Sequence, residues 1–139
     1  MLRAHLAALR AVLEAVALLA GKLHTAVRTT TDGVLVRENY LVVTPTMPAV
    51  RANRHTARQR IDGRSRWRFD VRVVAVTSDG VLLLTDAVRS AVGAVPVVAG
   101  RACTAITVVD PVEDGRVIHD RTSDLYYLDL TLEFWSGGL

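Results

Sequence analysis

The segment RWRFDVRVVAV, residues 66–76, decides the fold, because its apolar and polar side chains alternate without a break over most of its length. The apolar set lies on one side of an extended chain and consists of Trp67, Phe69, Val71, Val73 and Ala75. Arginines and an aspartate occupy the other side. Alternation with a period of two is typical of a strand that buries one face. We therefore predict a half-buried β-strand here.

Three further segments have strand patterns. Residues 126–135 alternate in the same way as 66–76, and residues 34–44 alternate up to Pro45 and Pro48, which we expect to end that strand. Residues 97–109 are apolar on both faces, which predicts a strand in the middle of a sheet.

Two segments have helical spacing. Leucines recur at intervals of three and four over residues 1–25, which predicts an N-terminal helix whose apolar face packs on the sheet. Residues 77–80, TSDG, offer capping chemistry for a second helix, which Gly93 and Pro96 close. The order of elements predicts one α+β domain over residues 1–139, with two layers: a mainly antiparallel sheet of about four strands packed by two helices.

Composition narrows the class of protein further. Of 139 residues, 50% are hydrophobic and 22% are charged, which excludes a chain that is disordered throughout. The single cysteine excludes a disulfide framework and a multi-cysteine zinc site. Arg10 and Glu14 interrupt the N-terminal apolar run, so we expect neither a signal peptide nor a membrane span but a cytoplasmic helix, and no membrane partner.

Motifs for catalysis or cofactor binding are missing from the sequence, and we expect neither an enzyme nor a cofactor. The adjacent His119 and Asp120 could form an acid–base pair, but a polar surface loop explains them better. The clustered carboxylates of Asp110, Glu113 and Asp114 could hold a hard cation, although such clusters more commonly cap turns and the spacing is not that of an EF-hand. We expect Cys103 to be a small buried hydrophobic residue.

Charge is divided unevenly along the chain. The net charge is +3, with a run of arginines in the middle and a surplus of carboxylates after residue 110. A basic region and an acidic region on one chain can hold copies of that chain together, although two solvated segments would explain the pattern equally well. The candidate interface residues are Arg51, Arg54, Arg58, Arg60, Arg64, Arg66, Asp110, Glu113, Asp114, Asp120 and Asp124.

Residues 49–65 hold most of these arginines and no aromatic residue, so we expect an extended loop or hairpin arm. Its guanidinium groups could bind phosphates without sequence preference, though no aromatic side chains are interleaved for base stacking. They could instead pair with carboxylates of a protein neighbour, or the arm could simply be solvated. The sequence leaves these alternatives open.

Several strings and their order resemble bacteriophage tail terminator proteins of long-tailed phages. The strings are RENYLVVTP at 37–45, FDVRVVAV at 69–76, DAVRSAV at 86–92, PVVAGRAC at 96–103 and YYLDLTLEFWS at 126–136. Together they extend the resemblance over most of residues 1–136.

This resemblance implies a structural virion protein without catalytic activity. Tail terminators form a ring, of six copies in this family, on the last ring of the tail-tube protein, end tail growth and join the tail to the head-closure connector. DNA passes through the ring lumen without specific binding, and the protein is in the virion, or in the host cytoplasm during assembly. The alternatives are another neck or head-closure protein, and a sequence-independent nucleic-acid-binding domain that uses Arg51–Arg68.

Overall fold

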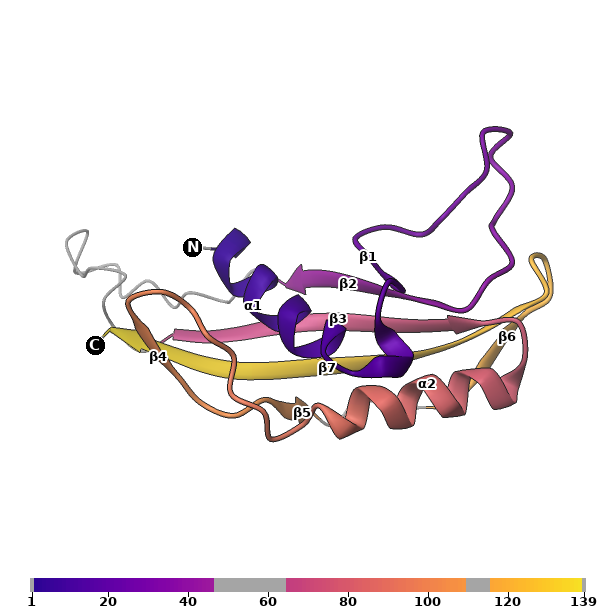
Figure 1. Cartoon of the computed structure of the whole chain (residues 1–139). Coiled ribbons are helices and arrows are strands. Elements are labelled where there is room, and N and C mark those ends of the chain that lie inside the picture. Colours follow the sequence, from indigo (N-terminus) through magenta and orange to yellow (C-terminus); the bar gives the residue numbers. More distant parts are fainter. Residues whose placement is uncertain (1, 47–64, 110–115, 139) are drawn as a thin grey trace, which may run out of the picture.

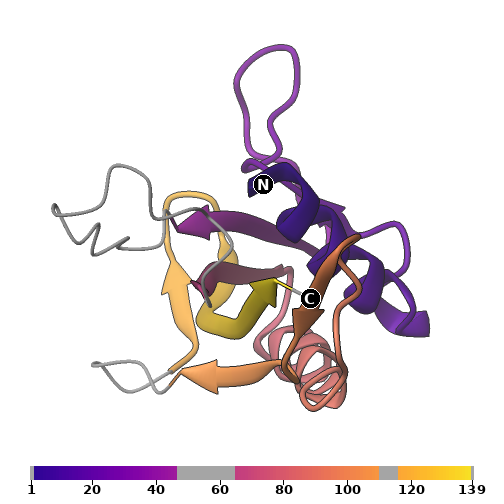
Figure 2. The same ribbon diagram turned by 90° about the vertical axis from the view of Figure 1, so that its left-hand side faces the viewer.

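The computed structural model describes residues 2–46, 65–109 and 116–138, and two α-helices there cover one face of a seven-stranded sheet (Figures 1 and 2). The helical elements are α1 (Leu2–Glu14), the 3₁₀ turn η1 (Ala17–Leu19) and α2 (Ser78–Ser90). The strands are β1 (Leu23–His24), β2 (Tyr40–Thr46), β3 (Ser65–Ala75), β4 (Arg101–Cys103), β5 (Thr107–Val109), β6 (Ile118–Asp120) and β7 (Leu125–Gly138). The predicted α+β class is confirmed.

β3 is the central strand, and it pairs antiparallel with β2 on one side and with β7 on the other. Its predicted alternation is confirmed, because Phe69, Val71, Val73 and Ala75 are fully buried and Trp67 is nearly so. These side chains meet Leu9 and Leu13 of α1 and the inner face of α2 in one core. The leucine face of the N-terminal helix therefore packs on the sheet, as predicted.

β7 explains why the sheet has more strands than the four predicted. Its second edge is paired with three short strands in succession, β4 near its end, β5 in the middle and β6 near its start. The central strand predicted over 97–109 is wrong, since this segment lies along an edge and is broken. The break allows Ile106 to enter the core while its backbone bonds to Gly93 and Ala94 after α2, and Val97 is 85% exposed.

The N-terminal helix is shorter than the predicted 1–25. It ends at Glu14, and the Glu14 carboxylate accepts a hydrogen bond from the backbone N–H of Gly21. The chain then turns through η1, which buries Leu19, and Gly21 takes a positive φ of 75°. The helix cannot continue to residue 25, because Leu23 and His24 are extended and form β1, which pairs with β2.

The strand predicted over 34–44 begins six residues later and continues past Pro45. Leu41 donates its backbone N–H to the Lys22 carbonyl in the β1 direction, so odd-numbered residues of β2 turn their N–H groups away from β3. Proline is tolerated where the missing donor would have pointed off the sheet, which is why Pro45 does not end the strand.

Residues 25–39 form instead a loop that projects beyond the sheet (Figure 1). Backbone hydrogen bonds brace it, from Thr30 to Val34 and from Val36 to Arg28, and Gly33 takes a φ of 79° in the predicted turn.

The second helix begins where predicted. The Thr77 side chain accepts a hydrogen bond from the backbone N–H of Gly80 at 3.0 Å, and Thr77 has the extended backbone of an N-cap residue. The helix ends at Ser90, and Gly93 follows with a φ of 95°. Within the described ranges, no helix is long and apolar enough to span a lipid bilayer.

Candidate functional site

The sheet face opposite the helices carries the charged side chains of β3 and β7, and it is the candidate interaction surface of this chain. Even-numbered residues of β3 point to this face, and the strand register places odd-numbered residues of β7 directly opposite them. The facing pairs are Arg66 with Trp135, Arg68 with Glu133, Asp70 with Thr131, and Arg72 with Asp129. We call this set the charged ladder.

In most facing pairs of the charged ladder, the two side chains are in direct contact. Arg68 Nε lies 2.7 Å from Glu133 Oε2, and Arg66 Nε lies 3.7 Å from the same oxygen. Thr131 donates its hydroxyl to Asp70 at 3.2 Å. Opposite-charge pairs directly across two strands stabilise the sheet by a few tenths of a kcal/mol to about 1 kcal/mol each.

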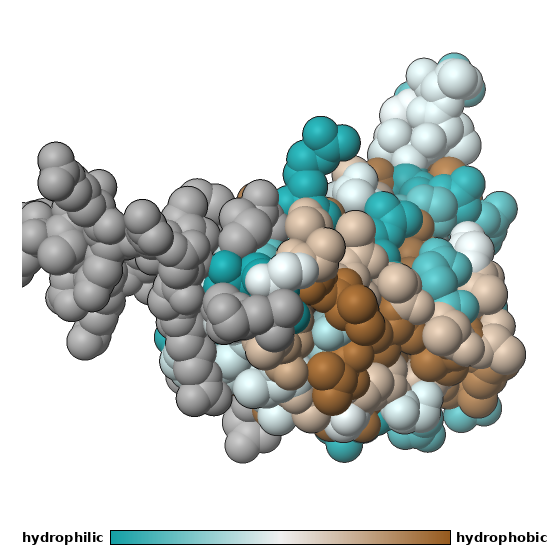
Figure 3. All heavy atoms as spheres, turned by 60° about the vertical axis from the view of Figure 1, so that its left-hand side comes forward, coloured by the Kyte–Doolittle hydropathy of each residue, from teal (hydrophilic) through white to brown (hydrophobic). Residues whose placement is uncertain are grey.

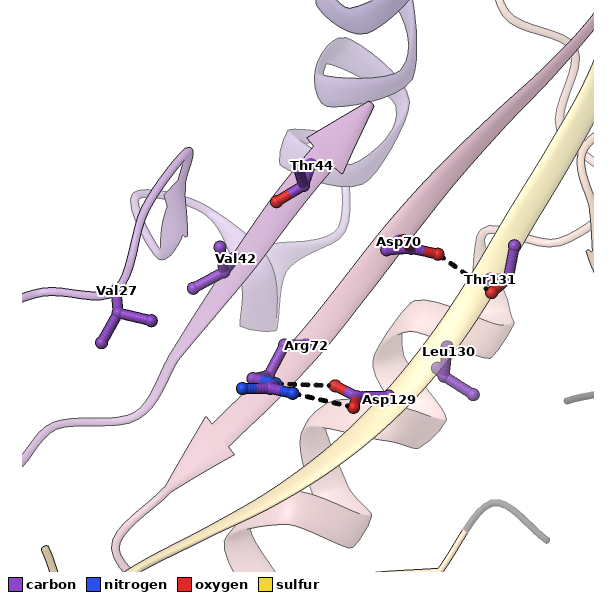
Figure 4. Close-up of a pocket in the computed structure, with 8 residues that line it drawn as sticks. All are labelled: Val27, Val42, Thr44, Asp70, Arg72, Asp129, Leu130 and Thr131. Carbon is purple, nitrogen blue, oxygen red and sulfur yellow. Dashed lines mark hydrogen bonds and ion pairs between the residues drawn. The ribbon is translucent and has the colours of Figure 1, made fainter. Parts of the chain in front are cut away.

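Arg72 has the most complete set of contacts. Its Nε and Nη2 donate to the two oxygens of Asp129 at 2.8 and 3.0 Å (Figure 4). Its guanidinium carbon lies 4.4 Å from the ring centre of Tyr127. The hydrogen bond to Asp129 raises the pKa of Arg72 further above its ordinary value. Arg72 is therefore held in place by its own chain.

The charged ladder changes how the division of charge along the sequence is interpreted. The basic and acidic segments were expected to meet between copies of the chain, yet β3 and β7 are neighbours in one sheet. Arg66, Arg68 and Arg72 are balanced within this face by Asp70, Asp129 and Glu133. Much of the opposite charge in the described part of the sequence therefore cancels inside the fold.

A shallow hollow of about 480 Å³ lies on this face, beside the loop formed by residues 25–39. It is lined by Val27, Val42, Thr44, Asp70, Arg72, Asp129, Leu130 and Thr131 (Figure 4). Beyond it, Leu35 of the loop packs on Tyr40, Val42, Val74 and Leu125, which form a second, small core. The root of the loop thus covers one end of the face, and its tip stands free as a projection of mainly intermediate hydropathy (Figure 3).

Asp120 and Asp124, two of the predicted interface residues, lie at the turn between β6 and β7. Asp120 accepts hydrogen bonds from the Ser123 hydroxyl and the Thr122 backbone, which lower its pKa below the ordinary value. Asp124 has a positive φ of 55°. The Asp120 carboxylate is therefore engaged within its own chain.

Asp124, rather than Asp120, is the partner of His119. His119 Nε2 lies 2.9 Å from Asp124 Oδ1, Arg37 donates to Asp124 Oδ2 at 3.2 Å, and the two contacts lower the pKa of Asp124, the histidine contact most. The His119 ring also stacks on Tyr126. This arrangement fastens the β6–β7 turn to the root of the projecting loop.

Most of the predicted interface residues lie outside the described residues. They are Arg51, Arg54, Arg58, Arg60, Arg64, Asp110, Glu113 and Asp114. The segment 47–64 joins Thr46 to Ser65 at one end of the sheet, and Arg66 is the first arginine after this segment that the structure describes. Residues 110–115 join β5 to β6.

A buried polar cluster lies at the end of the sheet that carries Thr46 and Ser65, and the sequence analysis did not predict it. His5 is fully buried, stacks on Trp67 at 3.8 Å and is hydrogen-bonded through Nε2 to Ser136 Oγ at 2.9 Å. Arg101 donates to the hydroxyl and the carbonyl of Ser136 and, at 3.3 Å, to Ser65 Oγ. Because these residues are far apart in sequence, no local pattern could have indicated the cluster.

Metal ligation and the single cysteine can each be compared with the expectations from the sequence within the described ranges. There, no group of three or more His, Cys, Asp or Glu side chains is placed to hold a metal ion. Cys103 is partly exposed at the edge of the core, not buried as expected, because β4 pairs only with the very end of β7.

Comparison with known proteins identifies the fold. No protein-family model and no curated protein matches the sequence. Among solved structures, a chain in the virion of a native gene transfer agent (GTA) particle is similar, with a TM-score of 0.69 and 18% identity. The match covers 96% of this chain and 94% of that chain. This chain therefore has the fold of a virion chain over nearly its whole length.

Proposed function

We propose that this protein is a structural component of a virion, and that it acts there as a tail terminator. The observation that carries the proposal is the likeness to a gene transfer agent virion chain over nearly all of both chains. The resemblance of the sequence strings to tail terminators agrees with that likeness. In this role copies of the chain form a ring, of six subunits, that caps the tail tube and receives the head-closure connector.

The distribution of charge supports assembly through contacts between copies. The described arginines next to the arm, Arg66 and Arg68, already share the carboxylate of Glu133 in the same chain. The segment 47–64 holds five arginines against one aspartate, and 110–115 holds three carboxylates and no basic residue. Complementary surfaces on different parts of one chain make heterologous contacts, which form rings when the rotation between subunits closes and open filaments when it does not.

The remaining parts of the proposal follow from this role. The protein acts without catalysis, its partners are the tail-tube protein and the connector, and DNA passes through the ring without specific binding. It belongs to the virion, and to the host cytoplasm during assembly. A related role as another neck protein would use the same fold.

The decisive experiment measures the mass of the purified protein across concentration by native mass spectrometry, with negative-stain images of the largest species. A closed ring of identical subunits is the expected result. A chain that stays monomeric both alone and with tail tubes present would contradict the proposal.

Nucleic-acid binding is the second candidate, because of the five arginines of segment 47–64. It predicts an affinity for duplex DNA that falls steeply with salt, by one power of the salt concentration for each phosphate contact. The balanced charged ladder opposes it, since the arginines that the structure places on the sheet already face carboxylates.

A further inference from the structure

The outer face of α2 exposes leucines that the fold does not cover. Val81, Leu84 and Val88 face the core, whereas Leu82 and Leu83 are 51% and 55% exposed. At helical spacing Leu83 lies between Asp79 and Asp86, which are exposed, and Ser90 continues the same side. We call Asp79, Leu82, Leu83, Asp86 and Ser90 the α2 stripe.

The two aspartates of the α2 stripe differ from the other carboxylates in their surroundings. Within the described parts of the chain, neither Asp79 nor Asp86 has an ion-pair partner, whereas Glu133, Asp129 and Asp124 each have an arginine. Asp79 lies in the first turn of α2, where the helix dipole favours a negative charge. Asp86 lies in the middle of the helix and has no such role.

The chain itself supplies a segment of the complementary chemistry. Residues 47–64 have five arginines against Asp62, and Met47, Val50 and Ile61 are apolar. Arginine forks match carboxylates, and apolar side chains would cover exposed leucines. Arg89 is also exposed and follows Asp86 by three residues on the same outer face, so the complementary charge lies toward Asp79 and Asp86 and not at the last turn of α2. Over that part the α2 stripe and this segment fit each other in both charge and hydropathy.

The length of the segment limits which part of α2 it could reach within its own chain. Its ends are fixed at Thr46 and Ser65, so its eighteen residues extend at most about 30 Å from that end of the sheet. β3 alone covers roughly 33 Å, and α2 begins past its far end (Figure 1). Because α2 runs back along the sheet at about 1.5 Å per residue, a chain's own segment could reach Asp86 and Ser90, but it reaches the first turn only at full extension. The segment of a neighbouring copy has no such limit, so a contact along the whole stripe favours a neighbour.

We propose that the α2 stripe is the docking surface for segment 47–64 of a neighbouring copy. The inference rests on the proposed function, because it names the contact through which the subunits assemble. Each copy gives its segment to one neighbour and receives the segment of another. This head-to-tail arrangement repeats until the ring closes.

Disulfide trapping between two different chains tests the contact. Both chains carry Cys103→Ser, which removes the single natural thiol. One chain carries Arg58→Cys, and the other carries Leu83→Cys. The matched control replaces the second chain with a Val34→Cys chain, whose thiol stands on the projecting loop at a site that is 63% exposed. We expect at least about ten times more disulfide heterodimer with Leu83→Cys than with Val34→Cys.

A second comparison tests the charge. Adding Asp86→Lys to the Leu83→Cys chain should lower the heterodimer yield at least about five-fold, whereas Asp32→Lys, the same change on the projecting loop, should leave it unchanged. Equal yields for Leu83→Cys and Val34→Cys, or no effect of Asp86→Lys, would overturn the inference. Circular dichroism of each variant checks that the chains are folded.

Native mass spectrometry of the same samples separates this inference from the proposed function. A closed ring without the Leu83 cross-link overturns the α2 contact and leaves the terminator proposal standing. The cross-link in open chains that never close supports the contact and contradicts the ring. Monomers without the cross-link contradict both.

Discussion

Arg68 on β3 and Glu133 on β7 are 65 residues apart in sequence, yet their side chains meet with 2.7 Å between Nε and Oε2. Arg66 approaches the same carboxylate at 3.7 Å. A basic run and an acidic run that look like two separate surfaces in the sequence are thus, in part, two neighbouring strands. Contacts with other molecules therefore depend on the charged side chains that have no ion-pair partner within the sheet.

Removing the Glu133 carboxylate is the direct test of this balance. Glu133→Gln leaves Arg66 and Arg68 without their anion, and because Glu133 is only 17% exposed we expect a loss of about 0.5–1 kcal/mol in the free energy of unfolding. Urea titration measures it. The control is Glu38→Gln, which removes the exposed partner of Arg28 and should cost less. Equal effects would show that the shared carboxylate has no special role.

The sequence was sufficient to predict the strands whose side chains alternate. It was insufficient where a strand's position or end depends on which distant backbone groups it bonds to. The β3 pattern and the Thr77 cap are local, so they could be read directly. The break at Ile106 depends on hydrogen bonds to Gly93 and Ala94, and the place of Pro45 depends on which edge of β2 is free. The His5–Ser136 contact joins the two ends of the chain, and no periodicity indicates such a pair.

Core packing between β3 and β7 supplies a second prediction. Phe69 is fully buried, and its ring stacks on Phe134 with 5.8 Å between centres. Phe69→Ala should lower the free energy of unfolding by about 3–5 kcal/mol, because it removes the buried ring and leaves a cavity. Val97→Ala, at an 85% exposed site, should change it by less than about 0.5 kcal/mol. Thermal and urea unfolding of both variants provide the comparison.

The buried polar cluster gives a third prediction. Ser136→Ala removes the hydroxyl that His5 and Arg101 share, and it leaves buried polar atoms without that partner. We expect a loss of about 1–3 kcal/mol in the free energy of unfolding. His5→Leu should cost a similar amount, and the double variant should cost less than the sum, because the two residues are in direct contact. Additive costs in the double-mutant cycle would argue against a shared network.

The turn between β6 and β7 should respond to acid. The His119 and Arg37 contacts lower the pKa of Asp124 below its ordinary value of 3.8, so the folded chain holds this carboxylate ionised more strongly than the unfolded chain does. The contribution to stability is therefore fully present above pH 3.8 and is lost as the pH falls through the lowered pKa. Asp124→Asn should remove it. Carbon-detected NMR titration of the Asp124 carboxyl measures the shift, and a midpoint at or above 3.8 would contradict the prediction.

Charge reversal in segment 47–64 tests the assembly itself. Arg58, Arg60 and Arg64 changed together to Glu should abolish ring formation and tail joining, because the segment would then repel the carboxylates it is proposed to bind. The fold should survive, since the core is formed mainly by residues of the described helices and strands. The matched control changes Arg3, Arg116 and Arg121 to Glu, which alters the net charge equally at three exposed sites. Native mass spectrometry, circular dichroism and electron microscopy of tails measure the outcome. Normal-length tails joined to heads by the Arg58, Arg60 and Arg64 variant would show that this segment is not the contact.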